Sequence, residues 1–138
     1  MAGMLDGKRA IVTGGGQGVG RGIALALAAQ GAAVALVGRT ESKLAAVAAE
    51  IEKPGGTALP IVADVTRPAD IRRCVEHTVT ELGGIDIVVN NAQVPALGSI
   101  LEVTDEAFGA CWESGPLAAF RLMKACHPHL RPGAQRAA

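Results

Sequence analysis

The octapeptide Thr13-Gly14-Gly15-Gly16-Gln17-Gly18-Val19-Gly20 lies between two segments with different hydrophobic patterns. Before it stands a short apolar run, residues 9–13 (RAIVT), which predicts a buried strand. After it, residues 19–30 place Ile23 and Leu27 four apart and precede a glycine, which predicts a helix. Glycines between a strand and a helix allow positive φ angles and let an anion approach the free amides at the helix start. The octapeptide therefore predicts a phosphate-binding turn, although glycine clusters also occur in turns that bind nothing.

The spacing of these glycines narrows the class of nucleotide site. The pattern is Gly14-x-x-x-Gly18-x-Gly20, which differs from the G-x-G-x-x-G of most dinucleotide-binding folds. No Gly-Lys-Ser/Thr follows, which excludes a P-loop nucleotide hydrolase. A second apolar run begins within about 30 residues of the first, as a strand–helix–strand unit requires. The context thus favours a dinucleotide site over a purely structural turn.

Strands and helices alternate along the rest of the chain. Apolar runs predict three further strands, at residues 33–37, 59–63 and 85–89. Threonines stand where the following helices need a cap, at Thr40, Thr66 and Thr104. This alternation predicts an α/β, Rossmann-like fold, namely an incomplete parallel sheet of strand order 3-2-1-4 with helices on both faces.

Two prolines refine this prediction. Pro60 indicates that the third strand lies at an edge, because proline has no N–H to donate to an interior ladder. Pro116 falls inside the last helix and should kink or interrupt it. We expect a partial Rossmann domain over residues 1–130 and an irregular tail over residues 131–138.

Composition sets the broad class of protein. The chain has 138 residues with 13 basic and 13 acidic side chains, so bulk charge attracts neither nucleic acid nor an anionic membrane. No signal peptide is evident, and the most apolar segment is too short to span a bilayer. The three cysteines are widely spaced and odd in number, which argues against a disulfide framework. We therefore expect a cytoplasmic protein.

Three short motifs, each after a predicted strand, together resemble the short-chain dehydrogenase/reductase family. Its T-G-x-x-x-G-x-G fingerprint is matched by the glycine turn, its Asp-apolar pair by Asp64-Val65, and most of its N-N-A-G motif by Asn90-Asn91-Ala92. Gln93 departs from the last glycine. The resemblance covers roughly residues 5–130 and implies an NAD(P)-dependent oxidoreductase that transfers a hydride between an alcohol and a carbonyl.

The resemblance and the motif positions give one predicted cofactor site. In an open parallel sheet, the carboxyl ends of the strands border the ligand. The resemblance implies that the Asp64 side chain and the Val65 backbone border the adenine, and that Asn90 and Asn91 brace the sheet end and the cofactor. The predicted cofactor-binding residues are Thr13, Gly14, Gly16, Gln17, Gly18, Val19, Gly20, Arg39, Asp64, Val65, Asn90, Asn91 and Ala92.

The end of the second strand predicts the choice of nicotinamide dinucleotide. NAD sites place an acid there for the ribose 2′-hydroxyl, whereas this chain has Gly38 followed by Arg39, which can pair with a 2′-phosphate. We predict NADP in preference to NAD. Gln17 weakens that preference, since a basic residue there would reinforce it. A methyltransferase is the alternative class, but it would need the same missing acid.

The catalytic residues that the resemblance implies are not found. The family uses a Tyr, a Lys four residues later, a Ser and a helix Asn, and this chain has no tyrosine. An N-x-x-G pattern set against Gly115 puts Trp112 at the Asn position, and Ser114 is only a weak substitute. We therefore predict no catalytic residue. Whether the chain is an enzyme stays uncertain, and we expect a fragment that stops before the catalytic half. A non-catalytic nucleotide-binding module and a non-functional product are the alternatives.

Metal and partner predictions follow from the same pattern. His127 and His129 lack nearby cysteine or carboxylate ligands, so no metal site is predicted. The fourth strand, residues 85–89, would form an open apolar edge, which favours self-association as a homo-oligomer through that edge. The substrate cannot be read from these residues.

Overall fold

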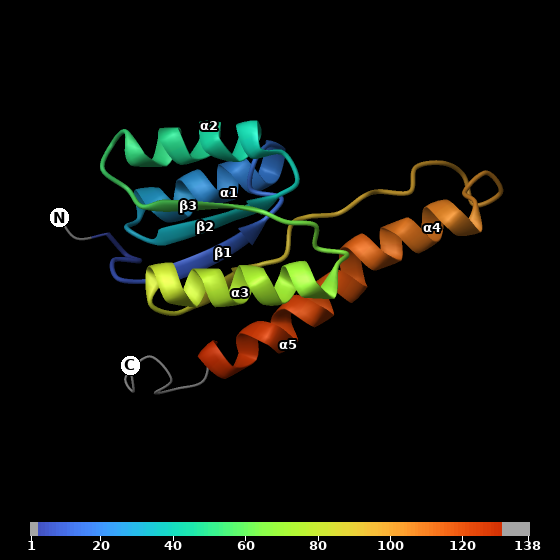
Figure 1. Ribbon diagram of the computed structural model, residues 1–138. Helices are drawn as coiled ribbons and strands as arrows, with labels where there is room; N and C mark the ends of the chain where they lie inside the picture. The colour runs from blue at the N-terminus through green and yellow to red at the C-terminus, as the bar shows by residue number, and fades with distance from the viewer. Residues whose placement is uncertain (1–2, 131–138) are drawn as a thin grey trace.

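The computed structural model describes residues 3–130, in which a parallel sheet carries helices on both faces (Figure 1). The strands are β1 (Arg9–Thr13), β2 (Ala33–Gly38), β3 (Ala58–Val62) and β4 (Ile87–Val89). Their order is β3-β2-β1-β4, with every neighbouring pair parallel. The predicted fold class and strand order are confirmed, and β3 with its Pro60 lies at an edge of the sheet as predicted.

Within residues 3–130, six helical segments connect and cover the strands. They are α1 (Gly18–Ala29), α2 (Glu41–Glu52), α3 (Pro68–Leu82), α4 (Asp105–Trp112), the π-helical η1 (Glu113–Leu117) and α5 (Ala118–Leu130). Helices α1 and α2 lie on one face of the sheet, and α3 and α5 lie on the other (Figure 1).

Alternation along the central strand divides the core into two layers. Ile11 packs with the buried residues of α3 and α5, and its neighbour Val12 packs with those of α1 and α2. Both side chains are fully buried, and each such side chain contributes about 1.5–3 kcal/mol relative to an exposed one. Because both faces of β1 and β2 are covered, these strands read as continuous apolar runs rather than as alternating ones.

Three details differ from the sequence prediction. Thr40 stands at the N-cap position of α2, but its side chain makes no cap hydrogen bond. Helix α3 begins at Pro68 with Arg67 as its N-cap residue, so Thr66 does not cap it. Proline suits the first helical position, where its missing N–H leaves nothing unpaired. The fourth strand begins at Ile87. The Asp86 carboxylate accepts from the Arg9 amide and from the Arg9 guanidinium, each at 2.9 Å, and the Asp86 amide donates to the Arg9 carbonyl. Ile85 is nevertheless fully buried beneath this corner.

The last helical rod changes to a π-helical turn at Pro116. The Thr104 hydroxyl accepts from the Ala107 amide at 3.1 Å and caps α4, as predicted. Proline has no N–H for the helical ladder and clashes with the carbonyl four residues before it. The wider π-helical turn η1 accommodates it, and the rod then continues as α5. The predicted interruption is thus a local widening of the helix.

The predicted irregular tail, residues 131–138, lies outside the described residues. Within residues 3–130, the helices are all too short or too polar to cross a membrane.

Candidate nucleotide-binding site

A cavity of about 400 Å³ opens where β1, β2 and β3 end. Of the predicted cofactor-binding residues, those that line it are Gly14, Gly16, Gln17, Gly18, Val19, Arg39, Asp64, Val65, Asn91 and Ala92. A second hollow of about 250 Å³ beside it is lined by Thr13 and Asn90 together with Asn91 and Ala92. Gly20 is buried beneath the glycine loop. The fold therefore gathers residues from four separate loops at one end of the sheet.

Two glycines of the loop have backbone angles that other residues rarely adopt. Gly14 has φ +64° and Gly18 has φ +55°, and no residue other than glycine has a positive φ in the described chain. A Cβ on Gly14 would also lie 2.7 Å from the side-chain nitrogen of Asn91. Side chains are thus excluded here both by conformation and by the close approach of the loop that follows β4.

Gly20 is required for a different reason, which is the contact between α1 and the loop. A Cβ at this position would lie 1.9 Å from the Gly14 carbonyl oxygen and 2.6 Å from the Asn91 amide nitrogen. Only glycine lets the first turn of α1 lie this close to the end of β1. The contact fixes the start of the helix over the mouth of the cavity.

The amides at this helix start form the anion-binding part of the site. The backbone N–H groups of residues 17–20 make no hydrogen bond to any part of residues 3–130. The next amide, that of Arg21, already bonds the Gln17 carbonyl at 3.1 Å. Unpaired N–H groups at the positive end of a helix dipole favour phosphate oxygens. The amides of residues 17–20 can therefore donate directly to the oxygens of a bound diphosphate.

Thr13 joins the two loops on either side of the cavity. Its hydroxyl oxygen accepts from the amides of Asn91 and Ala92, each at 3.0 Å, and its O–H donates to the Val89 carbonyl at 3.4 Å. The Asn91 side chain donates in turn to the Gly14 carbonyl at 3.3 Å. Since Thr13 is 3% exposed, these bonds hold the end of β4 against the glycine loop.

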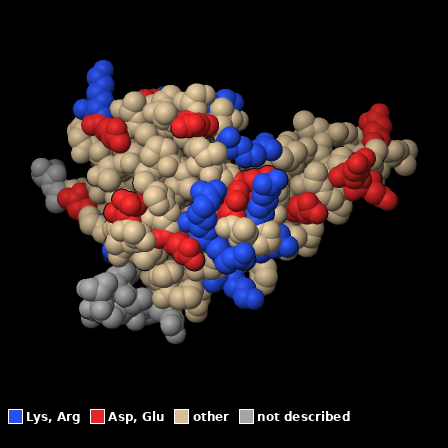
Figure 2. Space-filling view, viewed as in Figure 1, with Lys and Arg blue, Asp and Glu red and all other residues tan. Residues whose placement is uncertain are grey.

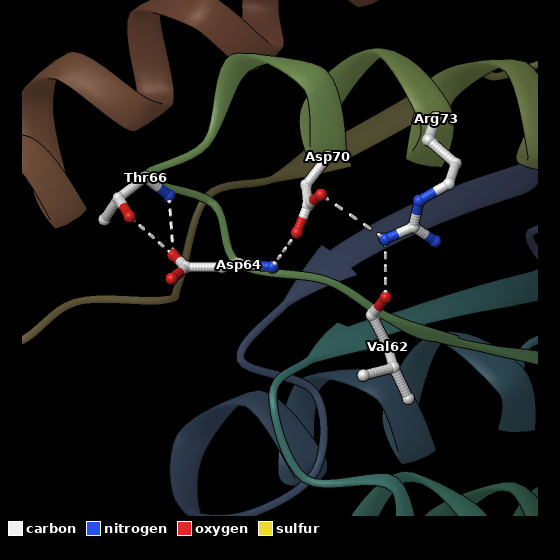
Figure 3. A network of polar contacts seen from close by, with 5 residues as sticks. All are labelled: Val62, Asp64, Thr66, Asp70 and Arg73. Atoms are coloured by element: carbon white, nitrogen blue, oxygen red, sulfur yellow. Dashed lines mark hydrogen bonds and ion pairs between the residues drawn. The ribbon is translucent and has the colours of Figure 1, made fainter.

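Asp64 sits in a hydrogen-bonded turn between β3 and α3 (Figure 3). One carboxylate oxygen accepts from the Thr66 amide at 2.9 Å and from its hydroxyl at 2.7 Å. The Thr66 hydroxyl, and then its amide, lower the pKa of the Asp64 carboxyl. The Asp64 amide donates to Asp70, and Arg73 donates to the Val62 carbonyl, both at 2.8 Å. The second Asp64 oxygen has no partner among the described residues and is free for a ligand.

Cations surround the β2 side of the cavity. Arg39 and Lys43 both line it, and the positive charge of Arg39 also lowers the pKa of the Asp64 carboxyl after the larger contribution from Thr66. The Lys43 ammonium donates to the Gln17 side-chain oxygen at 2.5 Å. In Figure 2, Lys and Arg side chains gather over the region where β3 ends and α3 begins.

Ser114 has a structural partner. Its side-chain oxygen accepts from the Val94 amide at 2.8 Å, and the residue is 4% exposed, so η1 holds the loop after β4. Gln93, which replaces the family glycine, donates to the Cys111 sulfur at 3.3 Å. Trp112, which occupies the position of the family asparagine, is 52% exposed. Among residues 3–130 there is no group of three or more side chains suited to a metal ion.

Sequence reasoning missed Lys43 and Thr66 as residues of this region, and it named Ser114 only as a weak substitute for the family asparagine. Arg39 lies before the extended N-cap residue Thr40, so helical spacing does not relate it to Lys43, and the contact of Lys43 with Gln17 joins residues that are 26 positions apart. Thr66 was interpreted as a helix cap, and its true partner is the preceding Asp64. Nothing in the sequence indicates the contact between Ser114 and Val94, which are 20 residues apart.

Comparison with known proteins places this arrangement in a family. The family model described as short chain dehydrogenase matches residues 8–137. This chain belongs to the short-chain dehydrogenase family. The 12alpha-hydroxysteroid dehydrogenase of Clostridium sp. is 41% identical, in a match that covers 94% of this chain and 53% of that protein.

Solved structures of short-chain dehydrogenases agree with the fold. A dehydrogenase/reductase from Sinorhizobium meliloti 1021 is 38% identical with a TM-score of 0.89, over 94% of this chain and 52% of that one. A short chain dehydrogenase from Burkholderia cenocepacia J2315, solved in complex with NADP, is 38% identical with a TM-score of 0.87, over 94% and 53%. The chain therefore spans about half the length of the short-chain dehydrogenases it matches.

Proposed function

We propose that this chain is the nicotinamide-dinucleotide-binding part of an oxidoreductase that interconverts alcohols and carbonyls, and that it prefers NADP to NAD. The observation that carries the proposal is the set of unpaired amides at residues 17–20, set in a loop whose glycines leave room for a diphosphate. A bound nicotinamide supplies the hydride acceptor or donor. The protein residues bind and orient it.

Each part of the cavity has a role in this proposal. The amides at the start of α1 hold the diphosphate, and the free Asp64 oxygen together with the Val65 backbone borders the adenine. Asn90, Asn91 and Ala92 border the smaller hollow beside the end of β4, where they brace the sheet end. The support for this assignment is that all these groups line two neighbouring hollows that share several lining residues at one end of the sheet.

The preference for NADP is supported by the end of β2. A Cβ on Gly38 would lie 3.2 Å from a methyl group of Leu44, which is 1% exposed and cannot easily move. An acidic side chain for the 2′-hydroxyl is thus both absent and poorly accommodated. Arg39 lines the cavity and forms no ion pair with a carboxylate within residues 3–130. Its charge is therefore available to a 2′-phosphate.

Isothermal titration of the purified chain with NADP⁺ and NAD⁺ tests both statements. Saturable binding of at least one of them is expected, with NADP⁺ the tighter. Arg39→Gln should weaken NADP⁺ by about tenfold or more, the loss of one charge-assisted contact, and leave NAD⁺ nearly unchanged. Arg72→Gln, an exposed arginine of α3 outside the cavity, is the matched control. Absence of binding by either nucleotide to folded protein would refute the proposed function.

A non-catalytic nucleotide-binding role is the second candidate, and it is favoured by the absence of tyrosine from these 138 residues. The two candidates differ in one measurement, which is the change in nicotinamide absorbance when the chain is mixed with NADPH and a carbonyl compound. Binding without hydride transfer supports the non-catalytic role for the chain taken alone.

We also propose that the chain is cytoplasmic and self-associates through β4. This strand pairs only with β1 in the described sheet, and its three residues, Ile87–Val89, are apolar and half-buried. An open apolar edge of this kind favours pairing with another strand. Light scattering should give a mass above that of one chain, and Val88→Lys should return the protein to monomer; a monomeric wild type would refute the proposal.

A further inference from the structure

The strongest unassigned feature of the cavity is the pairing of Lys43 with Gln17. Lys43 lies in the first turn of α2 and Gln17 in the glycine loop, so the bond joins two elements that are 26 residues apart. The lysine side chain is exposed, and such side chains usually extend into solvent. The Lys43 side chain instead lies over the glycine loop, where its ammonium bonds Gln17.

Gly16 accounts for part of this arrangement. A Cβ on Gly16 would lie 3.2 Å from the Cβ of Lys43 and 3.3 Å from a Leu44 methyl group. The bare backbone of Gly16 therefore lets the first turn of α2 rest directly on the loop. The lysine stem begins at this contact, and its ammonium ends on Gln17.

The charge of Lys43 is not neutralised by this contact. The Gln17 oxygen belongs to a neutral amide, and Lys43 forms no ion pair with a carboxylate in residues 3–130. Arg39, four residues earlier, is unpaired in the same sense, and both side chains line the one cavity. Glu41, the acidic residue of the same turn, does not line it. Two cations that form no close ion pair thus face a hollow whose described lining carries one carboxylate, that of Asp64, so the lining has a net positive charge that attracts a further anion.

We propose that Lys43, in the first turn of α2, is the second cation of the 2′-phosphate site beside Arg39, and that Gln17 positions it. The inference rests on the proposed function and deepens it by naming a residue that sets the choice between the two dinucleotides. It also reverses the expectation that Gln17 weakens the preference for NADP. The glutamine holds in place a positive charge that the loop itself lacks.

The test compares affinities for NADP⁺ and NAD⁺ by titration calorimetry on the 138-residue chain, with no dependence on activity. Lys43→Gln should raise the Kd for NADP⁺ about tenfold and change that for NAD⁺ by less than about twofold. Lys43→Arg retains the charge and should keep most of the preference. Lys53→Gln is the matched control, because Lys53 is an exposed lysine at the other end of α2, outside the cavity.

Gln17 acts through Lys43, and a double-mutant cycle tests this. Gln17→Ala alone should weaken NADP⁺ by about threefold, since the lysine loses its anchor but keeps its charge. Added to Lys43→Gln, it should have almost no further effect on the ratio of the two affinities. Additive effects would show that Gln17 contacts the nucleotide independently and would overturn its role as a positioning residue.

The outcomes separate this inference from the proposed function. Equal weakening of NADP⁺ and NAD⁺ by Lys43→Gln, or an effect no larger than that of Lys53→Gln, would overturn the assignment of Lys43 while leaving the nucleotide site in place. If the folded wild-type chain binds neither nucleotide, the proposed function fails and the assignment fails with it. Loss of preference in Lys43→Gln with recovery in Lys43→Arg supports it.

Discussion

Replacing Gly20 and Gly22 by alanine in turn should change stability in opposite directions, although both lie in α1. A Cβ on Gly20 would lie 1.9 Å from the Gly14 carbonyl oxygen, where ordinary contact begins at 3.4 Å, so helix and loop must separate by about 1.5 Å. A Cβ on Gly22 meets nothing within 4 Å. The same chemical change thus creates a clash at one position and none at the other.

The magnitudes follow from two opposing effects. Alanine gains up to about 1 kcal/mol over glycine in a helix interior, and this gain applies fully to Gly22→Ala. Forcing a methyl group into a packed contact costs about 1–3 kcal/mol, and the large displacement needed at Gly20 places it at the upper end. We expect Gly22→Ala to be more stable than wild type by about 0.5–1 kcal/mol and Gly20→Ala to be less stable by about 1–2 kcal/mol.

Urea unfolding followed by circular dichroism measures both free energies, and calorimetric titration of NADP⁺ measures the effect on the cavity. Gly20→Ala should also lose nucleotide affinity, because the amides at the start of α1 move away from the loop, whereas Gly22→Ala should bind as wild type does. If both variants gain stability equally, the close approach of α1 to the end of β1 is wrong, and the phosphate cradle loses its geometric basis.

Two further predictions concern ionisation. Thr66→Val removes the hydroxyl that lowers the pKa of the Asp64 carboxyl, so that pKa should rise toward the ordinary value of an aspartate, as measured by NMR titration. A group whose pKa is depressed by folding stabilises the fold fully above its unfolded pKa, and this stabilisation is lost as pH falls through its folded pKa. The free energy of unfolding of wild type should therefore exceed that of Thr66→Val near neutral pH, and the difference should shrink below about pH 4; a difference that stays the same down to about pH 2 would contradict this. Burial raises the pKa of Cys74 to about 11 and that of Cys126 to about 12, so only Cys111 should react quickly with a thiol reagent near neutral pH; three fast thiols would refute the packing of α3 on α5.

Much of the sheet was predictable because strong local signals determine it. The glycine turn, the buried runs of β1 and β2, and the proline of β3 each constrain the backbone directly, and together they leave few parallel topologies. The order of the strands was confirmed for this reason. The start of β4 was less predictable, because the Asp86 side chain bonds Arg9 at the start of β1, and no sequence pattern indicates this contact.

The candidate site was predictable in its backbone and less so in its side chains. Motif positions correctly indicated which loops meet, since parallel strands end at one edge. The partners of Thr66 and Lys43 depend on tertiary distances that no short pattern contains. Thr66 satisfies a helix-cap pattern but bonds the residue two before it, because Pro68 already suits the first turn of α3. Local preference and tertiary contact compete at such positions, and the contact prevails.

The Thr13 hydroxyl has a consequence for motion in this protein. One oxygen receives the amides of two consecutive residues after β4, and the Asn91 side chain returns a bond to the glycine loop. The two loops therefore cannot move independently, and a ligand that restricts the motion of one loop also restricts that of the other. A nucleotide that binds the glycine loop should therefore also slow deuterium uptake at the amides of Asn91 and Ala92, because Thr13 holds both amides against that loop.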